Sequence, residues 1–168
     1  MYKYSNTEIK GYNSSKIAEG EKNDCFVRAM AAATNVDYDT AHSFVKKTFK
    51  REDKKGTENI HIVNAMAGFQ EEGMVIGDKT FKVNVLPKSK ITNTYKLYGE
   101  LVKRKKTVKS FIKDNPKGTF IVGVAKHAFT VKDGVLIDNV GEEWRPTRKV
   151  DSAYKVVGKP EYVQLSLF

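Results

Sequence analysis

The chain is poor in the residue types that build disulfide-linked and metal-dependent proteins, with one cysteine and three histidines in 168 residues. A single cysteine, Cys25, excludes an internal disulfide framework and a zinc site built from several cysteine ligands. No apolar run approaches the ~18 residues that a membrane-spanning helix needs. The first 16 residues also lack the apolar core of a secretory signal. We therefore expect a protein of the reducing cytoplasm, with no metal, no cofactor and no membrane contact.

The composition is that of a folded protein with a strong positive charge. Hydrophobic residues make up 40% of the chain and aromatic residues 11%, which excludes the disordered and low-complexity classes. The length favours one domain covering residues 1–168. Lysine and arginine number 30 against 20 aspartates and glutamates, so the formal net charge is +10. An excess of this size indicates either an anionic partner or a well-solvated surface.

The positive charge is concentrated in the middle of the chain. Residues 79–117 contain twelve lysines and arginines but only Glu100 and Asp114 as acids, so this segment alone accounts for the net charge. Tyrosines interleaved with its lysines could stack on bases, which predicts a weak contact with nucleic acid. The alternative is a solvated face that only keeps the protein soluble. The densest cluster, and hence the candidate nucleic-acid-binding set, is Lys103, Arg104, Lys105 and Lys106.

Helical signals dominate the first half of the chain and strand signals dominate the second. Apolar spacing predicts helices over 24–34, 37–49 and 57–73, and a short helix after Thr107. Alternation predicts strands over 80–86, 118–125, 127–132, 135–139, 156–157 and 161–168. Residues 94–106 fit helix and strand equally, and residues 1–20 indicate an extended arm or a short strand. This order predicts an α+β fold in which N-terminal helices pack on a C-terminal antiparallel sheet.

The strongest local signal is the Asp133-Gly134 pair, which is typical of a two-residue type I′ hairpin turn. Such a turn pairs residues whose numbers sum to 267, so His127 would face position 140. Asp138 lies on the same face of the return strand and within ~8 Å, which makes it the better group to orient an imidazole. Asn139 should point the other way, unless a bulge reverses the two.

Cys25 lies at the start of the first long helix, where backbone N–H groups and the helix dipole stabilise a thiolate. Asp24 next to it opposes that effect, and a lone cysteine among alanines is also typical of a small buried side chain. Together with His127 and Asp138, Cys25 could form a catalytic triad for nucleophilic attack on a carbonyl group. A thiolate attacks a carbonyl, an imidazole moves the proton, and a third group fixes the tautomer.

Three stretches resemble a group of small bacteriophage proteins with a papain-like, C39-type peptidase fold: NDCFVRAMAAATN (23–35), KTVKSFIKDNPKGTFIVGVAKHAFTVKDGVLIDN (106–139) and RPTRKV (145–150). The resemblance implies Cys25 as nucleophile, His127 as base and Asp138 as the orienting group. Such families usually carry a glutamine near position 19 that completes the oxyanion hole, and this chain has Glu19 there. Asn23 could supply an amide instead.

Two functions follow as hypotheses. The first is a cysteine peptidase or related acyl-transfer hydrolase acting on a peptide or protein, located in an infected host cell or in a virion. The second is an inactive peptidase-like protein that binds nucleic acid or belongs to the virion. We expect the loops after Gly56, Gly77 and Val140 to line the pocket in either case.

Overall fold

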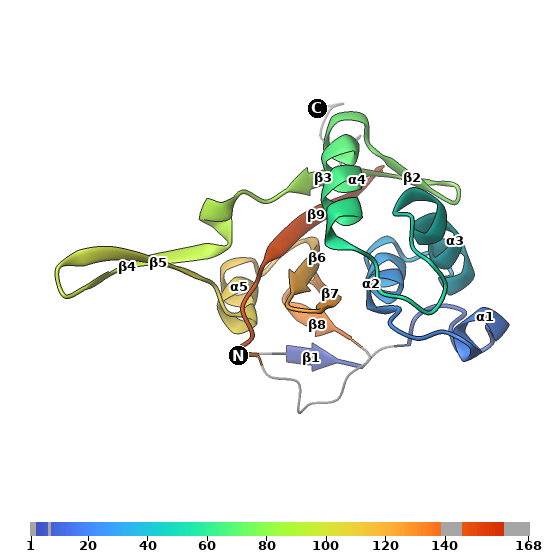
Figure 1. The fold of residues 1–168 in the computed structure, drawn as a ribbon, viewed down its shortest axis with the longest axis horizontal. Coiled ribbons are helices and arrows are strands. Elements are labelled where there is room, and N and C mark those ends of the chain that lie inside the picture. The colour runs from blue at the N-terminus through green and yellow to red at the C-terminus, as the bar shows by residue number, and fades with distance from the viewer. Residues whose placement is uncertain (1–2, 7, 139–145, 160–168) are drawn as a thin grey trace.

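The computed structural model describes residues 3–6, 8–138 and 146–159, and its centre is a seven-stranded sheet (Figure 1). The strand order is β1-β8-β7-β6-β9-β3-β2, and every pairing is antiparallel except the one between β1 and β8. The strands are β1 Lys3–Ser5, β2 Met74–Ile76, β3 Lys79–Val85, β6 Thr119–Val124, β7 His127–Lys132, β8 Val135–Ile137 and β9 Ser152–Gly158. The helices are α1 Lys16–Glu19, α2 Cys25–Thr34, α3 Tyr38–Thr48, α4 Asn59–Glu72 and α5 Val108–Asp114.

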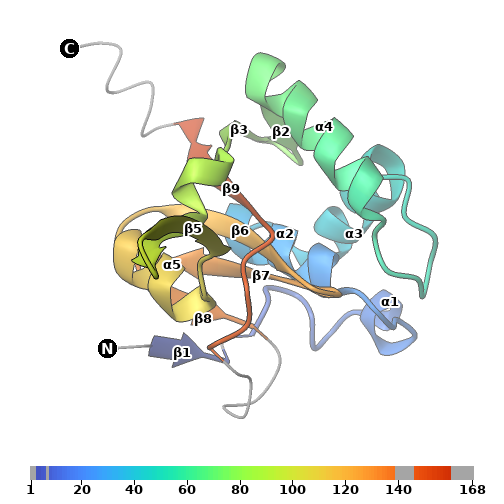
Figure 2. The same ribbon diagram turned by 60° about the vertical axis from the view of Figure 1, so that its left-hand side comes forward.

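Helices cover both faces of the sheet (Figure 2). On one side α2 packs on β7, β6 and β9, α3 packs on α2 and β2, and α4 packs on β3, forming a core that includes Met30 and Ile121. On the other side α5 packs on β6, β7 and β8 around Phe111, Phe120 and Phe129. Alternate residues of β6 enter the two cores because side chains of a strand point to opposite faces. The expected α+β class is thus confirmed, although one helix lies opposite the others.

The local signals of the sequence have their expected structural counterparts. Asp133 and Gly134 both have positive φ, at 47° and 80°, as a type I′ turn requires. The two strands that flank this turn pair Val131 with Leu136 and Lys132 with Val135, which confirms the predicted register. Thr107 caps α5 by accepting a hydrogen bond from the backbone N–H of Ser110.

Residues 94–106, which the sequence left ambiguous, belong almost entirely to a separate two-stranded hairpin of residues 92–105. Its strands are β4 (Thr92–Leu97) and β5 (Glu100–Lys105), preceded by a short 3-10 helix, η1 (Lys88–Lys90). Figure 1 shows this hairpin projecting away from the rest of the molecule. At its tip, the fully solvent-facing Tyr98 is 98% exposed.

Three elements were missed from the sequence: the one-turn helix α1, the edge strand β2 and the short helix η1. The N-terminal arm does contain a short strand, β1, but it pairs in parallel with β8. The strand expected over 161–168 lies outside the described residues. Among the helices that the structure describes, none is long and apolar enough to cross a membrane.

Candidate active site

Three elements that are far apart in the sequence bring Cys25, His127 and Asp138 together. Cys25 is the first residue of α2, His127 is the first residue of β7, and Asp138 directly follows β8. Nε2 of His127 lies 2.6 Å from Oδ2 of Asp138, and Cys25 lines the same cleft as His127 and interacts electrostatically with its ring. Because Asp138 engages Nε2, Nδ1 is the ring nitrogen available to the sulfur. The structure therefore assembles the predicted nucleophile, base and orienting group in one contact chain.

The environment of His127 favours its protonated form. Burial of the ring opposes protonation, but hydrogen bonds to Asp138 and Cys25 outweigh burial and raise the pKa of His127 from 6.5 to about 9. The Asp138 carboxylate is itself buried, with 4% of its side chain exposed, so its charge is weakly screened. At neutral pH the ring is an imidazolium held between a carboxylate and a thiol.

The carboxylate of Asp24, which precedes the nucleophile, is neutralised by two neighbours. Nε of Arg28 lies 3.0 Å from Oδ1 of Asp24, and the hydroxyl of Tyr38 donates to Oδ2 at 2.7 Å. Burial and the bond to Asp24 raise the pKa of Tyr38 well above its ordinary range, so the hydroxyl remains a donor. Arg28 is also placed over the ring of Tyr12, at 4.1 Å from the centroid. From the sequence, the negative charge of Asp24 is expected to disfavour a thiolate at Cys25. In the structure, Arg28 and Tyr38 compensate most of that charge.

This arrangement gives a first prediction. Replacing Arg28 by glutamine leaves a buried negative charge beside Cys25, which disfavours a second negative charge on the sulfur. We expect the rate of Cys25 alkylation by iodoacetamide at pH 6 to fall about tenfold. The double variant Asp24→Asn/Arg28→Gln removes both charges and should recover most of the lost rate. An unchanged rate in Arg28→Gln would show that Asp24 has no influence on the thiol.

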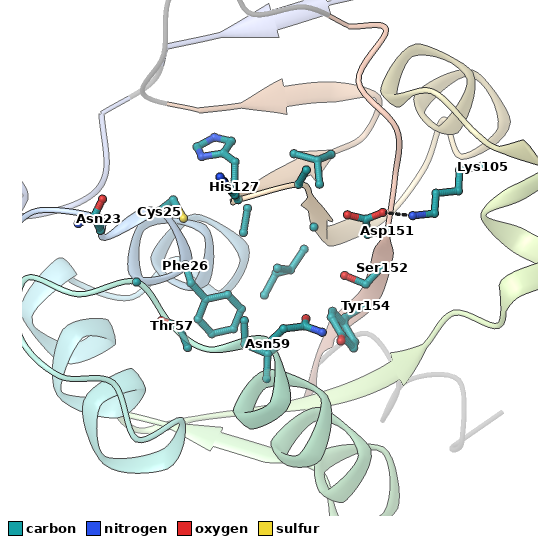
Figure 3. A pocket seen from close by; sticks show the side chains of 18 of the residues that line it. Asn23, Cys25, Phe26, Thr57, Asn59, Lys105, His127, Asp151, Ser152 and Tyr154 are labelled. Carbon is teal, nitrogen blue, oxygen red and sulfur yellow. Dashed lines mark hydrogen bonds and ion pairs between the residues drawn. The ribbon is translucent and has the colours of Figure 1, made fainter.

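A cleft of about 830 Å³ opens on one side of Cys25. Figure 3 shows Cys25 and His127 at one end of this cleft, and Lys105 with Asp151 across from them. A smaller cavity of about 300 Å³ is also lined by Cys25, together with Arg28 and Asp138. Cys25 lines both cavities, so the residue borders on two spaces that a ligand could occupy.

The cleft lining only partly matches the expected loops. Gly56 lines the cleft as expected, whereas Gly77 lies in the turn between β2 and β3 and is not among the lining residues, and Val140 lies outside the described residues. Sequence reasoning missed the contribution of β9, which supplies Ser152 and Tyr154. Only the pairing of β9 between β6 and β3 brings them here, and no local pattern encodes that pairing.

The groups considered for oxyanion binding differ in whether they are available at the cleft. The backbone N–H of Cys25 is one of those that a helix start leaves without an intrahelical partner. Asn23 lines the cleft, but its amide donates to the carbonyl oxygen of Lys54 at 3.2 Å. Glu19 is exposed and is not among the cleft-lining residues, so its carboxylate does not face the sulfur. Asn139, the alternative orienting residue, lies outside the described residues.

A buried ionic cluster fixes the loop beside the nucleophile. Glu21 accepts hydrogen bonds from Arg51 at 2.9 Å, from His42 at 2.5 Å and from the backbone N–H of Lys54 at 2.6 Å. Burial opposes ionisation, but these donors, Arg51 first, lower the pKa of Glu21 from 4.5 to about 2. Glu21, His42 and Asp53 are close enough to ligate a metal ion, within 4.8 Å of one another. The guanidinium of Arg51 already provides the cation, so the cluster is an ion-pair network.

The basic cluster predicted to bind nucleic acid is partly neutralised within the protein. Lys105 pairs with Asp151 at 2.5 Å, and Lys106 pairs with Asp114 at 2.5 Å. Lys103 and Arg104 are exposed on β5. The sequence placed these four cations in one set, but their side chains have different surroundings.

Comparisons of the chain with protein-family models, with curated proteins and with solved structures found no match. The roles of the site residues therefore rest on the geometry and chemistry of this chain.

Proposed function

We propose that the protein is a cysteine peptidase, or a related acyl-transfer hydrolase, with the papain-like arrangement that its motifs resemble. The observation that carries this proposal is the contact chain from Cys25 through His127 to Asp138. A nucleophile in contact with a base, and a base held by a third group, is the geometry that covalent catalysis requires. Asp138, being buried, orients the ring and stabilises its positive charge.

In the proposed reaction, the thiolate of Cys25 attacks the carbonyl carbon of a peptide or isopeptide bond. The carbonyl oxygen gains the negative charge and is stabilised by the backbone N–H of Cys25. His127 gives its proton to the leaving amine as the C–N bond breaks, which leaves an acyl group on the sulfur. A water molecule then attacks the acyl carbon while His127 takes its proton. The carboxylic acid leaves and the thiolate–imidazolium pair is restored.

The two cavities that Cys25 lines favour a polypeptide substrate cleaved within the chain. The larger cleft is about 830 Å³ and the smaller one about 300 Å³, and Cys25 is among the lining residues of both. An extended chain rises about 3.3 Å per residue, so residues on either side of the reacting bond can occupy the two cavities. We therefore propose a peptide or protein, entering in extended form, as the substrate.

Alkylation of the single cysteine tests this function directly. A thiol paired with an imidazolium reacts with iodoacetamide at pH 6, whereas an ordinary thiol, with a pKa of about 8.5, reacts slowly there. We expect Cys25 to be alkylated at pH 6 at least about tenfold faster than the thiol of the urea-unfolded protein. Since the chain has one cysteine, mass spectrometry reports this site alone. A native rate below the unfolded rate would identify Cys25 as a structural side chain and reject the proposal.

The pKa of His127 sets the alkaline limit of the reaction. Because the folded-state pKa is about 9, the imidazolium persists through neutral pH and is lost as the pH rises past that value. We expect kcat/KM for hydrolysis of fluorescein-labelled casein to fall above about pH 9, since the leaving amine then receives no proton. A decline already complete at pH 7 would contradict the proposed Asp138–His127–Cys25 coupling.

A further inference from the structure

The projecting hairpin has one face on which lysines gather. In its register Thr92 pairs with Lys105, Thr94 with Lys103, and Lys96 with Leu101. Directly paired residues lie on the same face of a two-stranded ribbon, and residues two apart along a strand share that face. Lys96, Lys103 and Lys105 therefore follow one another along a single face.

That face begins at the proposed catalytic cleft. The side chain of Lys105 lines the cleft, where its Nζ atom lies 2.5 Å from Oδ1 of Asp151 (Figure 3). The opposite face of the hairpin turns toward the body of the protein at its base, where Asn93 donates a hydrogen bond to Ser110 of α5 at 3.3 Å. The lysine-bearing face is therefore continuous with the cleft wall at Lys105, and beyond Lys105 its side chains are exposed.

The two lysines beyond Lys105 have uncompensated charges. Lys96 and Lys103 are exposed, and within the described part of the chain neither has an acidic partner. Leu101, which is paired with Lys96, leaves 72% of its surface exposed. Such a surface, with separated cations and an exposed apolar side chain, fits an acidic polypeptide segment with apolar residues among its carboxylates.

We propose that this lysine face, Lys96 and Lys103 beyond Lys105, binds an acidic segment of the polypeptide substrate outside the cleft. The identity of that segment as substrate rests on the proposed peptidase function. Lys103 and Lys105 are two residues apart on β5, about 6.6 Å, which equals the spacing of alternate side chains in an extended chain. Lys96 of β4 is paired with Leu101, one such step farther along the same face. An acidic residue at every second position therefore matches the ribbon. The segment increases the affinity for substrate and takes no part in bond cleavage.

Nucleic acid is the less favoured occupant. A duplex requires a series of cations that neutralise successive phosphates. Two cations of the basic cluster, Lys105 and Lys106, are already paired with carboxylates, and Glu100 adds a negative charge near the hairpin tip. Exposed Leu101, which shares the lysine face, also suits a polypeptide better than a phosphate backbone.

Fluorescence anisotropy with labelled probes tests the proposal. The probes are a fluorescein-labelled (Glu-Gly)6 peptide, the matched (Gln-Gly)6 peptide and a 20-base-pair DNA duplex, each added to full-length Cys25→Ala protein in 50 mM NaCl. We expect (Glu-Gly)6 to bind and (Gln-Gly)6 not to bind. Replacing Lys96 and Lys103 by glutamine should weaken (Glu-Gly)6 binding about three- to tenfold, as for two exposed ion pairs. The control variant Lys113→Gln/Lys117→Gln removes the same charge from exposed positions outside the hairpin. It should change the affinity for (Glu-Gly)6 less than about twofold.

A second measurement links the face to the substrate. In the Cys25-containing protein, Lys96→Gln/Lys103→Gln should raise KM for acidic, unstructured casein and leave kcat and the alkylation rate of Cys25 unchanged. The proposal would be overturned if the hairpin variant and the control variant weakened (Glu-Gly)6 binding equally, or if (Glu-Gly)6 did not bind at all. Tighter binding of the duplex, lost only in the hairpin variant, would assign the face to nucleic acid. If Cys25 alkylation is slow while the peptide still binds, the peptidase function alone fails.

Discussion

Replacing His127 by glutamine is expected to lower the rate of Cys25 alkylation at pH 6 by about 10- to 100-fold. In the native protein the thiol contacts an imidazolium whose pKa is about 9. Without that cation, an ordinary thiol is only about 0.3% ionised at pH 6. The loss is smaller than this fraction alone implies, because a more basic thiolate is also a better nucleophile. The rate constant for modification by iodoacetamide, followed by intact-protein mass spectrometry, measures the effect.

Hydrolysis should respond more strongly than alkylation, because His127 also donates a proton to the leaving group. We expect His127→Gln to reduce hydrolysis of labelled casein by at least about 10³-fold. Asp138→Asn should leave the fold intact and reduce hydrolysis less than His127→Gln, since an amide can still bond the ring but not stabilise its charge. His61→Gln is the matched control, because His61 is a partly exposed side chain of α4. A loss of hydrolysis in the control equal to that in His127→Gln would refute the assignment.

Replacing Glu21 by glutamine is expected to lower the free energy of unfolding by about 3 kcal/mol. The Arg51 side chain is 0% exposed and its charge is balanced by Glu21. Removing one partner of a buried ion pair leaves the other charge uncompensated, which typically costs 3–5 kcal/mol, and the glutamine oxygen offsets part of it. Urea denaturation at pH 7 followed by circular dichroism gives the difference. Glu19→Gln is the control, since Glu19 is exposed two residues earlier in the chain.

The pH dependence of this difference identifies its origin. The pKa of Glu21 falls from 4.5 to about 2 on folding, so its contribution is complete above about pH 4.5. It is lost as the pH decreases from there to about pH 2. The stabilities of the native protein and of Glu21→Gln should therefore converge in that interval. A difference that is constant from pH 7 to pH 2 would show that packing, and not charge, is responsible.

The features that could be predicted from the sequence depend on contacts between neighbours in the chain. Asp133 and Gly134 encode their turn without help from the rest of the fold, and the turn then sets the register that places Asp138 beside His127. The cap at Thr107 is equally local. The hairpin of residues 92–105 was ambiguous because both its faces are largely exposed, so no apolar alternation marks it.

The unpredicted features depend on partners that lie far away in the sequence. Arg51 belongs to the stretch KREDKKG, whose composition indicates a solvated loop. Nevertheless, only 3% of the surface of the whole residue is exposed. Its burial is possible only because Glu21, 30 residues earlier, supplies the opposite charge. In the same way, Lys105 and Lys106 look free in the sequence because Asp151 and Asp114 are not their neighbours in the chain.

The parallel strand β1 joins the site to the start of the chain, so we expect the site to assemble late in folding. The backbone N–H of Asp138 donates to the carbonyl oxygen of Ser5 at 3.3 Å, and the Tyr4 hydroxyl donates to the carbonyl oxygen of Asp138 across 134 residues of sequence. Contacts of such separation form slowly, because a long loop must close first. While the chain is being synthesised, Cys25 emerges long before His127 and Asp138. The proposed nucleophile therefore meets its proposed base and orienting group only after residue 138 has been made, so we expect a chain that ends before His127 to lack the proposed activity.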